Sequence, residues 1–270
     1  MNDRPLHLPD YRSPPIDEVV VGVQFPPIPN FQDVHVGLYW QKVRSNYPRA
    51  ETQPRIEGPI ETPGPPQANI PVIPISFAPT QARTWLISDT DDYLIQVQNT
   101  RFIQNWRRRN AEYPHFEAIH GLFEDHYQKF RELLKDEHLQ EPTVQQVEVS
   151  YINWVTGLPI SKFLRPGTSA TIQVGGQNHE PEDQNWGARY LLSASADTVE
   201  RLHVVCQAAT RPVPNMETGN IFQLVYHAAR AEGFTADEIR RLMPKGRDII
   251  VSTFDELTTA DAHAAWEKIK

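Results

Sequence analysis

The chain has 270 residues, of which 39% are hydrophobic and 10% aromatic, and its formal net charge is -8. These proportions suffice for a buried core and exclude a chain that is disordered throughout. No apolar run approaches the ~20 residues that a membrane-spanning helix needs, and the acidic balance argues against general affinity for nucleic acid.

The chain contains a single cysteine, Cys206. It cannot form an internal disulfide, which is typical of proteins of the reducing cytoplasm. Leu202 and Val204 fall on the same side of the predicted strand, so we interpret Cys206 as a core residue rather than a nucleophile. The N-terminal residues lack the apolar segment of a secretion signal. We therefore expect a cytoplasmic protein.

The N-terminal part begins with a proline-rich segment, residues 1–15, that predicts a flexible or draped tail. Residues 16–25 alternate apolar and polar side chains and predict the first strand, and residues 31–47 predict a helix that ends at Pro48. Sixteen of the 24 prolines precede residue 80. Residues 49–79 therefore predict an insertion that is either strapped across the surface or mobile, in which residues 55–57 and 73–77 are candidates for short edge strands.

Residues 83–109 predict a three-stranded antiparallel meander, with turns at residues 88–92 and 99–100. Its second hairpin is rich in amide and basic side chains, which we take as candidate binding residues: Gln96, Gln98, Arg101, Gln104, Asn105, Trp106, Arg107 and Arg108. Two interpretations stay open. The hairpin either forms a polar surface that recognises a partner or, more commonly, a solvated sheet face whose amide pairs hold the strand register.

Residues 114–139 predict a long amphipathic helix. On it Glu117, His120 and Glu124 share one face, as the ligands of helix-bundle metal sites do. Such a site needs matching carboxylates from other helices, and the sequence contains no second motif of this kind. We therefore interpret His120 as a boundary histidine and predict neither metal nor cofactor, with these three residues as the alternative metal ligands.

The C-terminal part, residues 143–270, predicts a second antiparallel meander followed by helices. His203 and His227 lie on its predicted strands, where they could face one another, although strand histidines are usually structural. Thr235 and Glu238 have the spacing of a capping box at a helix start. The predicted strands are residues 145–155, 169–174, 188–195, 202–210 and 221–229, and helices at 248–257 and 260–269 complete the chain.

These elements predict an α+β fold of two antiparallel β-meanders, each packed by long helices. The N-terminal half comprises residues 16–142, with the insertion at 49–79, and the C-terminal half comprises residues 143–270. Because each half is a meander followed by a long helix, the pattern also suggests an internal pseudo-repeat. The sequence leaves open whether the two meanders form one continuous or a pseudo-twofold assembly.

Three passages resemble a known family: PPIDEVVVGVQF, RTWLISDTDDYLIQVQNTRFIQNWRR and YPHFEAIHGLFEDHYQKF. The family is a sporadically distributed group of conserved, uncharacterised bacterial proteins. The resemblance covers residues 14–154, and the remainder matches only in pattern. It supplies no reaction, cofactor or catalytic residue. Its patchy distribution implies an accessory or defence-type system.

The chain contains no phosphate-binding loop, nucleophile elbow or zinc-protease motif, so we predict no catalytic residues. We expect a non-enzymatic binding or regulatory protein that acts on another protein through the polar hairpin and the proline-rich insertion. The sequence leaves a homo-oligomer open and favours neither a membrane nor a nucleic acid as partner. The alternative is a small-molecule or nucleotide-binding effector, or a hydrolase, with its site in the cleft between sheet and helices.

Overall fold

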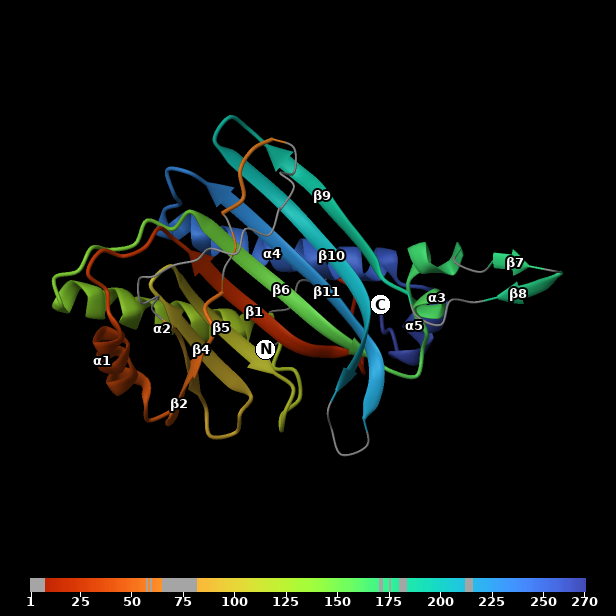
Figure 1. The fold of residues 1–270 in the computed structure, drawn as a ribbon, viewed down its shortest axis with the longest axis horizontal. Helices are drawn as coiled ribbons and strands as arrows, with labels where there is room; N and C mark the ends of the chain where they lie inside the picture. The colour runs from red at the N-terminus through yellow and green to blue at the C-terminus, as the bar shows by residue number, and fades with distance from the viewer. Residues whose placement is uncertain are drawn as a thin grey trace.

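The centre of the molecule is a nine-stranded antiparallel sheet with the strand order β2-β3-β4-β5-β1-β6-β11-β10-β9 (Figure 1). The computed structural model describes residues 8–56, 58, 60–64, 82–169, 172–174, 176–179, 184–211 and 216–270. The sheet strands are β1 (Ile16–Gln24), β2 (Arg49–Gln53), β3 (Arg83–Ile87), β4 (Tyr93–Gln98), β5 (Arg101–Arg107), β6 (Gln146–Val155), β9 (Trp186–Ala194), β10 (Thr198–Arg211) and β11 (Glu217–Arg230).

The helices confirm the α+β class. They are α1 (Asp33–Val43), α2 (Phe116–Asp136), α3 (Ile160–Phe163), α4 (Ala236–Leu257) and α5 (Ala260–Ala265), with a 3-10 helix at Arg165–Ser169. A small separate hairpin, β7 (Ile172–Val174) and β8 (Gln177–His179), projects from one end of the molecule (Figure 1). Among the described residues, no helix combines the length and the apolar character that crossing a bilayer requires.

One continuous sheet takes the place of the two predicted meanders, because β1 and β6 pair at its centre. Val19 lies opposite Tyr151 and Val21 opposite Val149 in this antiparallel pair. The β3-β4-β5 run therefore joins the β9-β10-β11 run through the two central strands. The hydrophobic core extends without interruption across both halves of the chain.

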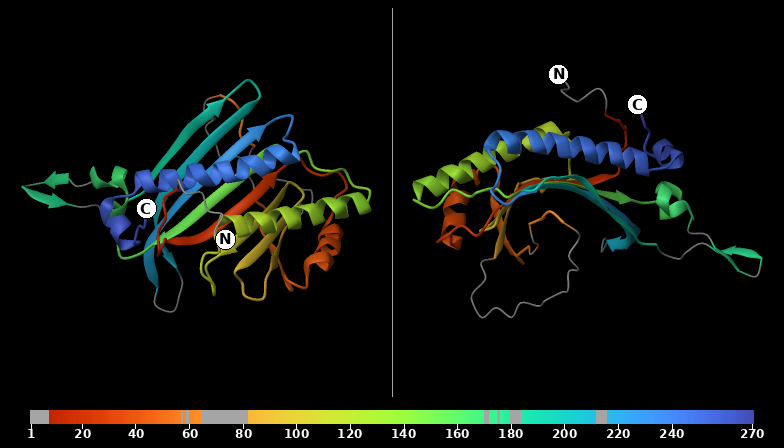
Figure 2. Two further views of the ribbon diagram at one scale, coloured as in Figure 1. Left: turned by 180° about the vertical axis from the view of Figure 1, so that it is seen from behind. Right: turned by 90° about the horizontal axis from the view of Figure 1, so that it is seen from above.

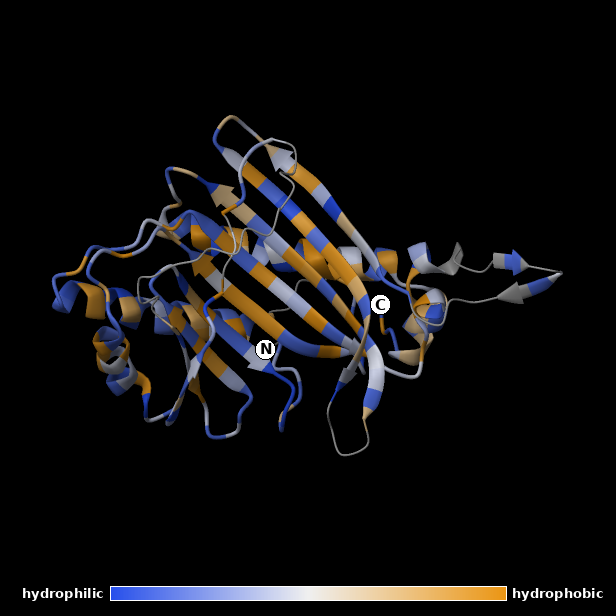
Figure 3. Cartoon of the chain, viewed as in Figure 1, coloured by the Kyte–Doolittle hydropathy of each residue, from blue (hydrophilic) through white to orange (hydrophobic). Residues whose placement is uncertain are grey.

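Helices α2 and α4 both lie against one face of the sheet, and we call the opposite side the open face (Figure 2). Strand residues alternate between hydrophobic and hydrophilic side chains (Figure 3), and this period of two sends one set to each face. The set that faces the helices includes Val147 and Val149 of β6, both fully buried. Cys206 belongs to the same core, as predicted.

Helix α4 begins at the predicted cap, where the Thr235 hydroxyl accepts a hydrogen bond from the Glu238 backbone N–H at 3.3 Å. The helix then runs unbroken through Pro244 to Leu257, instead of forming the separate helix predicted for residues 248–257. It packs closely on β11, because a Cβ added at Gly246 would overlap the Tyr226 ring.

Residues 8–15, the described part of the predicted tail, run beside the C-terminal end of the chain. The Ile269 backbone N–H donates to the Asp10 carbonyl oxygen at 2.7 Å, and the Tyr11 hydroxyl donates to Asp255 Oδ1 at 2.5 Å. This segment is therefore held by hydrogen bonds. Residues 1–7 lie outside the described residues.

Candidate functional site on the open face of the sheet

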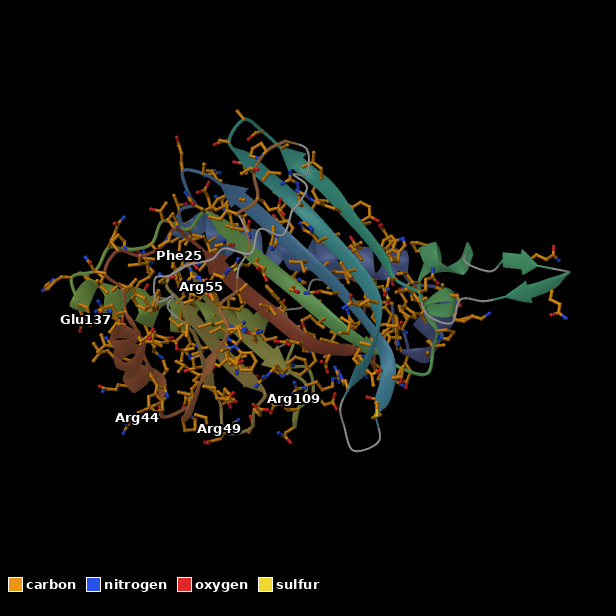
Figure 4. All side chains as sticks on the ribbon, viewed as in Figure 1. Phe25, Arg44, Arg49, Arg55, Arg109 and Glu137 are labelled. Carbon is orange, nitrogen blue, oxygen red and sulfur yellow. The ribbon has the colours of Figure 1, made fainter. Side chains whose placement is uncertain are left out.

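A segment of the proline-rich insertion crosses the open face. We call its described residues, 54–56, 58 and 60–64, the strap. In Figure 2 (right) the orange segment that follows β2 lies on the side of the sheet opposite α2 and α4. The strap begins near Arg55, labelled in Figure 4, whose Nη1 donates to Asn99 Oδ1 at 2.8 Å.

Side chains from the strands bind the main chain of the strap near its start. Gln98 of β4 makes two hydrogen bonds to one residue: its Oε1 accepts from the Ile56 N–H at 3.0 Å, and its Nε2 donates to the Ile56 carbonyl oxygen at 3.2 Å. The Gly58 carbonyl oxygen accepts from Gln24 Nε2 of β1 at 3.0 Å and from Arg101 Nη2 of β5 at 3.1 Å.

The same kind of contact continues farther along the strap. Gln146 Oε1 of β6 accepts from the Glu61 N–H at 2.8 Å, and Arg201 Nη2 of β10 donates to the Gly64 carbonyl oxygen at 2.9 Å. Strands β4 and β10, which bind Ile56 and Gly64, are five strand spacings apart, or about 24 Å. Eight residues of extended chain span about 26 Å. The strap therefore crosses the strands in an extended conformation.

This arrangement corrects one prediction. Arg55 and Ile56 do not form an edge strand, because strand side chains, not the main-chain ladder of a neighbouring strand, satisfy the Ile56 backbone. The edge strand of the insertion is β2, which pairs with β3. Glu57 and residues 73–77, also candidates for edge strands, lie outside the described residues.

The Glu61 carboxylate is bound by side chains of β9, β10 and β11, which we call the Glu61 pocket: Arg189, Arg201, His203 and His227. Oε2 of Glu61 lies 2.9 Å from Arg189 Nη2 and 2.5 Å from Arg201 Nη1. Oε1 lies 2.8 Å from His203 Nε2 and 3.5 Å from His227 Nδ1. Strand register assembles the pocket, because Arg189 pairs with His203, and Arg201 with His227, across neighbouring strands.

A second carboxylate, Glu148 of β6, lies on the far side of the His227 ring, with Oε2 at 3.4 Å from Nε2. Burial lowers the pKa of His227, but Glu148 and Glu61 outweigh burial and raise this pKa to about 9. Burial also acts to raise the pKa of Glu61, yet His203, His227 and Arg189 hold it well below its usual range. At neutral pH, a Glu61 carboxylate therefore faces a His227 imidazolium.

Glu61, His203 and His227 also place three metal-type ligand atoms within 4.8 Å of one another. Two imidazoles and a carboxylate are donors that Zn²⁺ accepts. However, Arg189 and Arg201 bind the same carboxylate, and a dication would add to their charge. A metal would also have to displace the proton of His227. The surroundings of this cluster therefore suit an anion better than a cation.

The predicted hairpin residues do not share one surface, because neighbouring strand positions point to opposite faces. Gln98 and Arg101 contact the strap, as described above. Gln96 lies on the same face, where its Oε1 accepts from Arg83 Nη1 at 2.7 Å and its Nε2 donates to Asn105 Oδ1 at 2.8 Å. Arg107 pairs with Asp91 at 2.6 Å. The side chains of this face are all buried, so this part of the sheet is not a solvated face: Gln96, Gln98, Arg101, Asn105 and Arg107.

Gln104 and Trp106 point to the helices, and both are fully buried. Gln104 Oε1 lies 2.8 Å from His126 Nδ1 of α2, and the Trp106 ring packs against Tyr113. Arg108, the last of the predicted hairpin residues, donates from Nη2 to the Pro14 carbonyl oxygen at 3.2 Å.

The alternative metal ligands do not converge. Glu117 pairs with Arg247 of α4 at 2.7 Å, and Glu124 pairs with Arg240 at 2.9 Å. The His120 ring stacks on Phe116. In the part of the chain that the structure describes, only Glu61, His203 and His227 form a group with metal-ligand spacing. The two glutamates of α2 instead tie this helix to α4.

A cavity of about 390 Å³ lies on the other face, between α2, α4 and the central strands. Aromatic rings and two ion pairs line it, including Tyr113, Phe116, Tyr151 and the pairs Glu117–Arg247 and Arg108–Glu112. The Tyr113 and Tyr151 hydroxyls are hydrogen-bonded to each other at 2.9 Å. This cavity occupies the cleft that the alternative function required.

Sequence reasoning identified His203 and His227 as strand residues that could face one another, and their ring centroids are 5.3 Å apart. It missed Glu61, Arg189 and Arg201. The only available signal was the strand alternation, which places Arg201 and His203 on one face of β10. Comparison of the chain with protein-family models, with curated proteins and with solved structures returned no match.

Proposed function

We propose that this chain is a non-enzymatic binding protein of a bacterial accessory or defence-type system, and that an extended segment of a partner protein binds the open face of its sheet. The bacterial context rests on the family resemblance of residues 14–154. The binding mode rests on the strap, whose main chain is bound by side chains of five different strands.

Main-chain N–H and C=O groups are common to all polypeptides, so side chains that bind them accept segments of different sequence. A neutral hydrogen bond of this kind contributes about 0.5–1.5 kcal/mol. The contacts of Gln98, Gln24, Arg101, Gln146 and Arg201 with the strap together make an extended segment a suitable ligand for this face.

The experiment uses a full-length variant in which residues 54–64 are replaced by a Gly/Ser segment of equal length. A fluorescently labelled synthetic peptide with the sequence of residues 54–64 is titrated with it, and anisotropy is recorded. We expect the variant to bind the peptide and Gln98→Ala to weaken binding. Gln128→Ala, at an exposed position of α2, is the matched control. If a folded strap-replaced protein does not bind the peptide, the proposed function is wrong.

The cavity between α2 and α4 favours a second candidate, a small-molecule-binding effector. Its volume of about 390 Å³ falls within the range of ligand pockets, about 300–1,000 Å³, and its wall combines aromatic rings with charged Arg247 and Glu117. Mass spectrometry of small molecules released from denatured protein tests this function. Val251→Trp would fill the cavity and should abolish the released species.

We also propose that the two halves of the chain arose by duplication. In each half the first strand pairs with the last strand: β1 pairs with β5, and β6 pairs with β11. A long helix, α2 or α4, follows the last strand of each half. Superposing the two halves of an experimental structure tests this proposal. Helices α2 and α4 should then coincide when the strands are matched.

A further inference from the structure

The Glu61 pocket gathers more positive charge than the main chain of the strap requires. We propose that this pocket is a carboxylate-recognition site that Glu61 fills from within the chain, and that a partner segment places an acidic side chain there in its stead. This inference rests on the proposed function and specifies the chemistry of the partner segment.

The first argument is the balance of charge. Arg189, Arg201 and His227 all lie within 3.5 Å of a Glu61 oxygen, and Glu148 is the other carboxylate against the His227 ring. Without Glu61 the pocket would hold an excess of cations, including the Arg201 side chain, which is only 4% exposed. A buried charge without a counterion is costly. The pocket therefore requires an anion whenever the strap leaves.

The second argument is geometry. Both carboxylate oxygens of Glu61 are bound, Oε2 by the two guanidinium groups and Oε1 by His203. The backbone N–H of the same residue is fixed by Gln146. The sheet thus specifies both the main-chain position and the side-chain charge of the residue that occupies the place of Glu61. An acidic residue five positions after the residue bound by Gln98 has the spacing from Ile56 to Glu61.

The strap and the partner segment would compete for the same donors. Because the strap is tethered to β2, it has a high effective concentration at the open face. Wild-type protein should therefore bind an added segment much more weakly than protein without the strap. The open face is in this sense autoinhibited by the strap.

The experiment compares two labelled peptides with the sequence of residues 54–64, one native and one with Gln in place of Glu61, bound to the strap-replaced protein. We expect the Gln peptide to bind about ten- to a hundredfold more weakly, since it loses hydrogen bonds between charged groups. Arg201→Ala should weaken binding of the native peptide and remove the preference for the native peptide over the Gln peptide. Arg241→Ala, at an exposed position of α4, is the matched control and should preserve that preference. If Arg201→Ala does not fold, Arg189→Ala, whose side chain is 32% exposed, takes its place.

Each other outcome has a defined meaning. Equal binding of the two peptides would overturn the carboxylate site while leaving the proposed function intact, whereas binding of neither would overturn both. Displacement of the native peptide by submillimolar inorganic phosphate would reassign the pocket to phosphate groups. Stoichiometric Zn²⁺ binding by the wild-type chain that is lost in both His203→Ala and His227→Ala would overturn the inference in favour of a metal site.

Discussion

His126 makes the stability of this protein depend on pH in a way that the structure allows us to calculate. The side chain is 2% exposed, and its Nδ1 lies 2.8 Å from Gln104 Oε1. Burial lowers its pKa to about 4 in the folded protein, compared with about 6.5 in an unfolded chain. The contribution of neutral His126 is therefore fully present above pH ~6.5 and is lost as pH falls towards 4. The loss is about 2 kcal/mol at about pH 5 and levels off at about 3 kcal/mol below pH ~4.

The perturbation that isolates this effect is His126→Gln, which keeps a polar partner for Gln104 but does not titrate. The Tyr39 hydroxyl donates to the main-chain oxygen of residue 126, so that hydrogen bond is retained. Free energies of unfolding come from urea titrations of both proteins at pH 7.5 and 5.0. Carboxylates contribute equally to both proteins, so they cancel in the difference. From pH 7.5 to pH 5.0 the free energy of unfolding of the variant, relative to that of wild type, should rise by about 2 kcal/mol. A difference that stays constant between the two pH values would refute the reasoning.

Three further predictions concern packing, capping and the strap. Gly246→Ala should lower the free energy of unfolding by about 1 kcal/mol, because overlap with the Tyr226 ring outweighs the gain in helix propensity. Gly37→Ala, whose new Cβ would meet nothing within 4 Å beyond its chain neighbours and the backbone of its own helix, should be neutral or stabilising. Thr235→Ala should cost about 0.5–2 kcal/mol in the same urea titrations through loss of the α4 cap, whereas Thr235→Ser should cost little. Protection of residues 60–64 from hydrogen exchange should be highest between about pH 5 and 6.5. The lowered pKa of Glu61 makes its contribution disappear as pH falls, and the pKa of His227, raised to about 9, makes its contribution disappear as pH rises; unchanged protection at pH 10, after correction for intrinsic exchange rates, would contradict this.

Local patterns in the sequence were sufficient for most of the fold. The strand period of two placed Cys206 in the core with Leu202 and Val204, and the Thr235–Glu238 spacing located the start of α4. The pairing of β1 with β6, which merges two predicted meanders into one sheet, was not predictable in this way. It joins segments more than a hundred residues apart, and no local pattern specifies such a pairing.

For the candidate site, the sequence could predict one part and not the other. Along β5, strand alternation alone separates Gln104 and Trp106 from Arg101 and Asn105, but the sequence interpretation grouped these residues by chemical type and so combined two faces. Glu61 could not have been found. It lies in a proline-rich segment without periodicity, and its partners Arg189 and His203 are 128 and 142 residues away in the chain. Only the folded sheet brings these charges together.

The open face also explains why a strap is present at all. Buried amides such as Gln98 and Gln146 cost about 1–3 kcal/mol each when they are buried without a hydrogen-bond partner, so a face built to bind main chain must be covered or hydrated at all times. The strap covers it with contacts that any extended segment can reproduce. Exchange of the strap for a partner segment therefore replaces hydrogen bonds almost one for one. A partner carboxylate only takes the place of Glu61 in the charged pocket, so the net preference for the partner must come from contacts outside the strap. Because a short tether gives an effective concentration of the order of millimolar, a partner that matched only the strap's contacts would have to reach a similar concentration to displace it. We therefore expect a physiological partner to contact this protein at a second surface as well as at the Glu61 pocket.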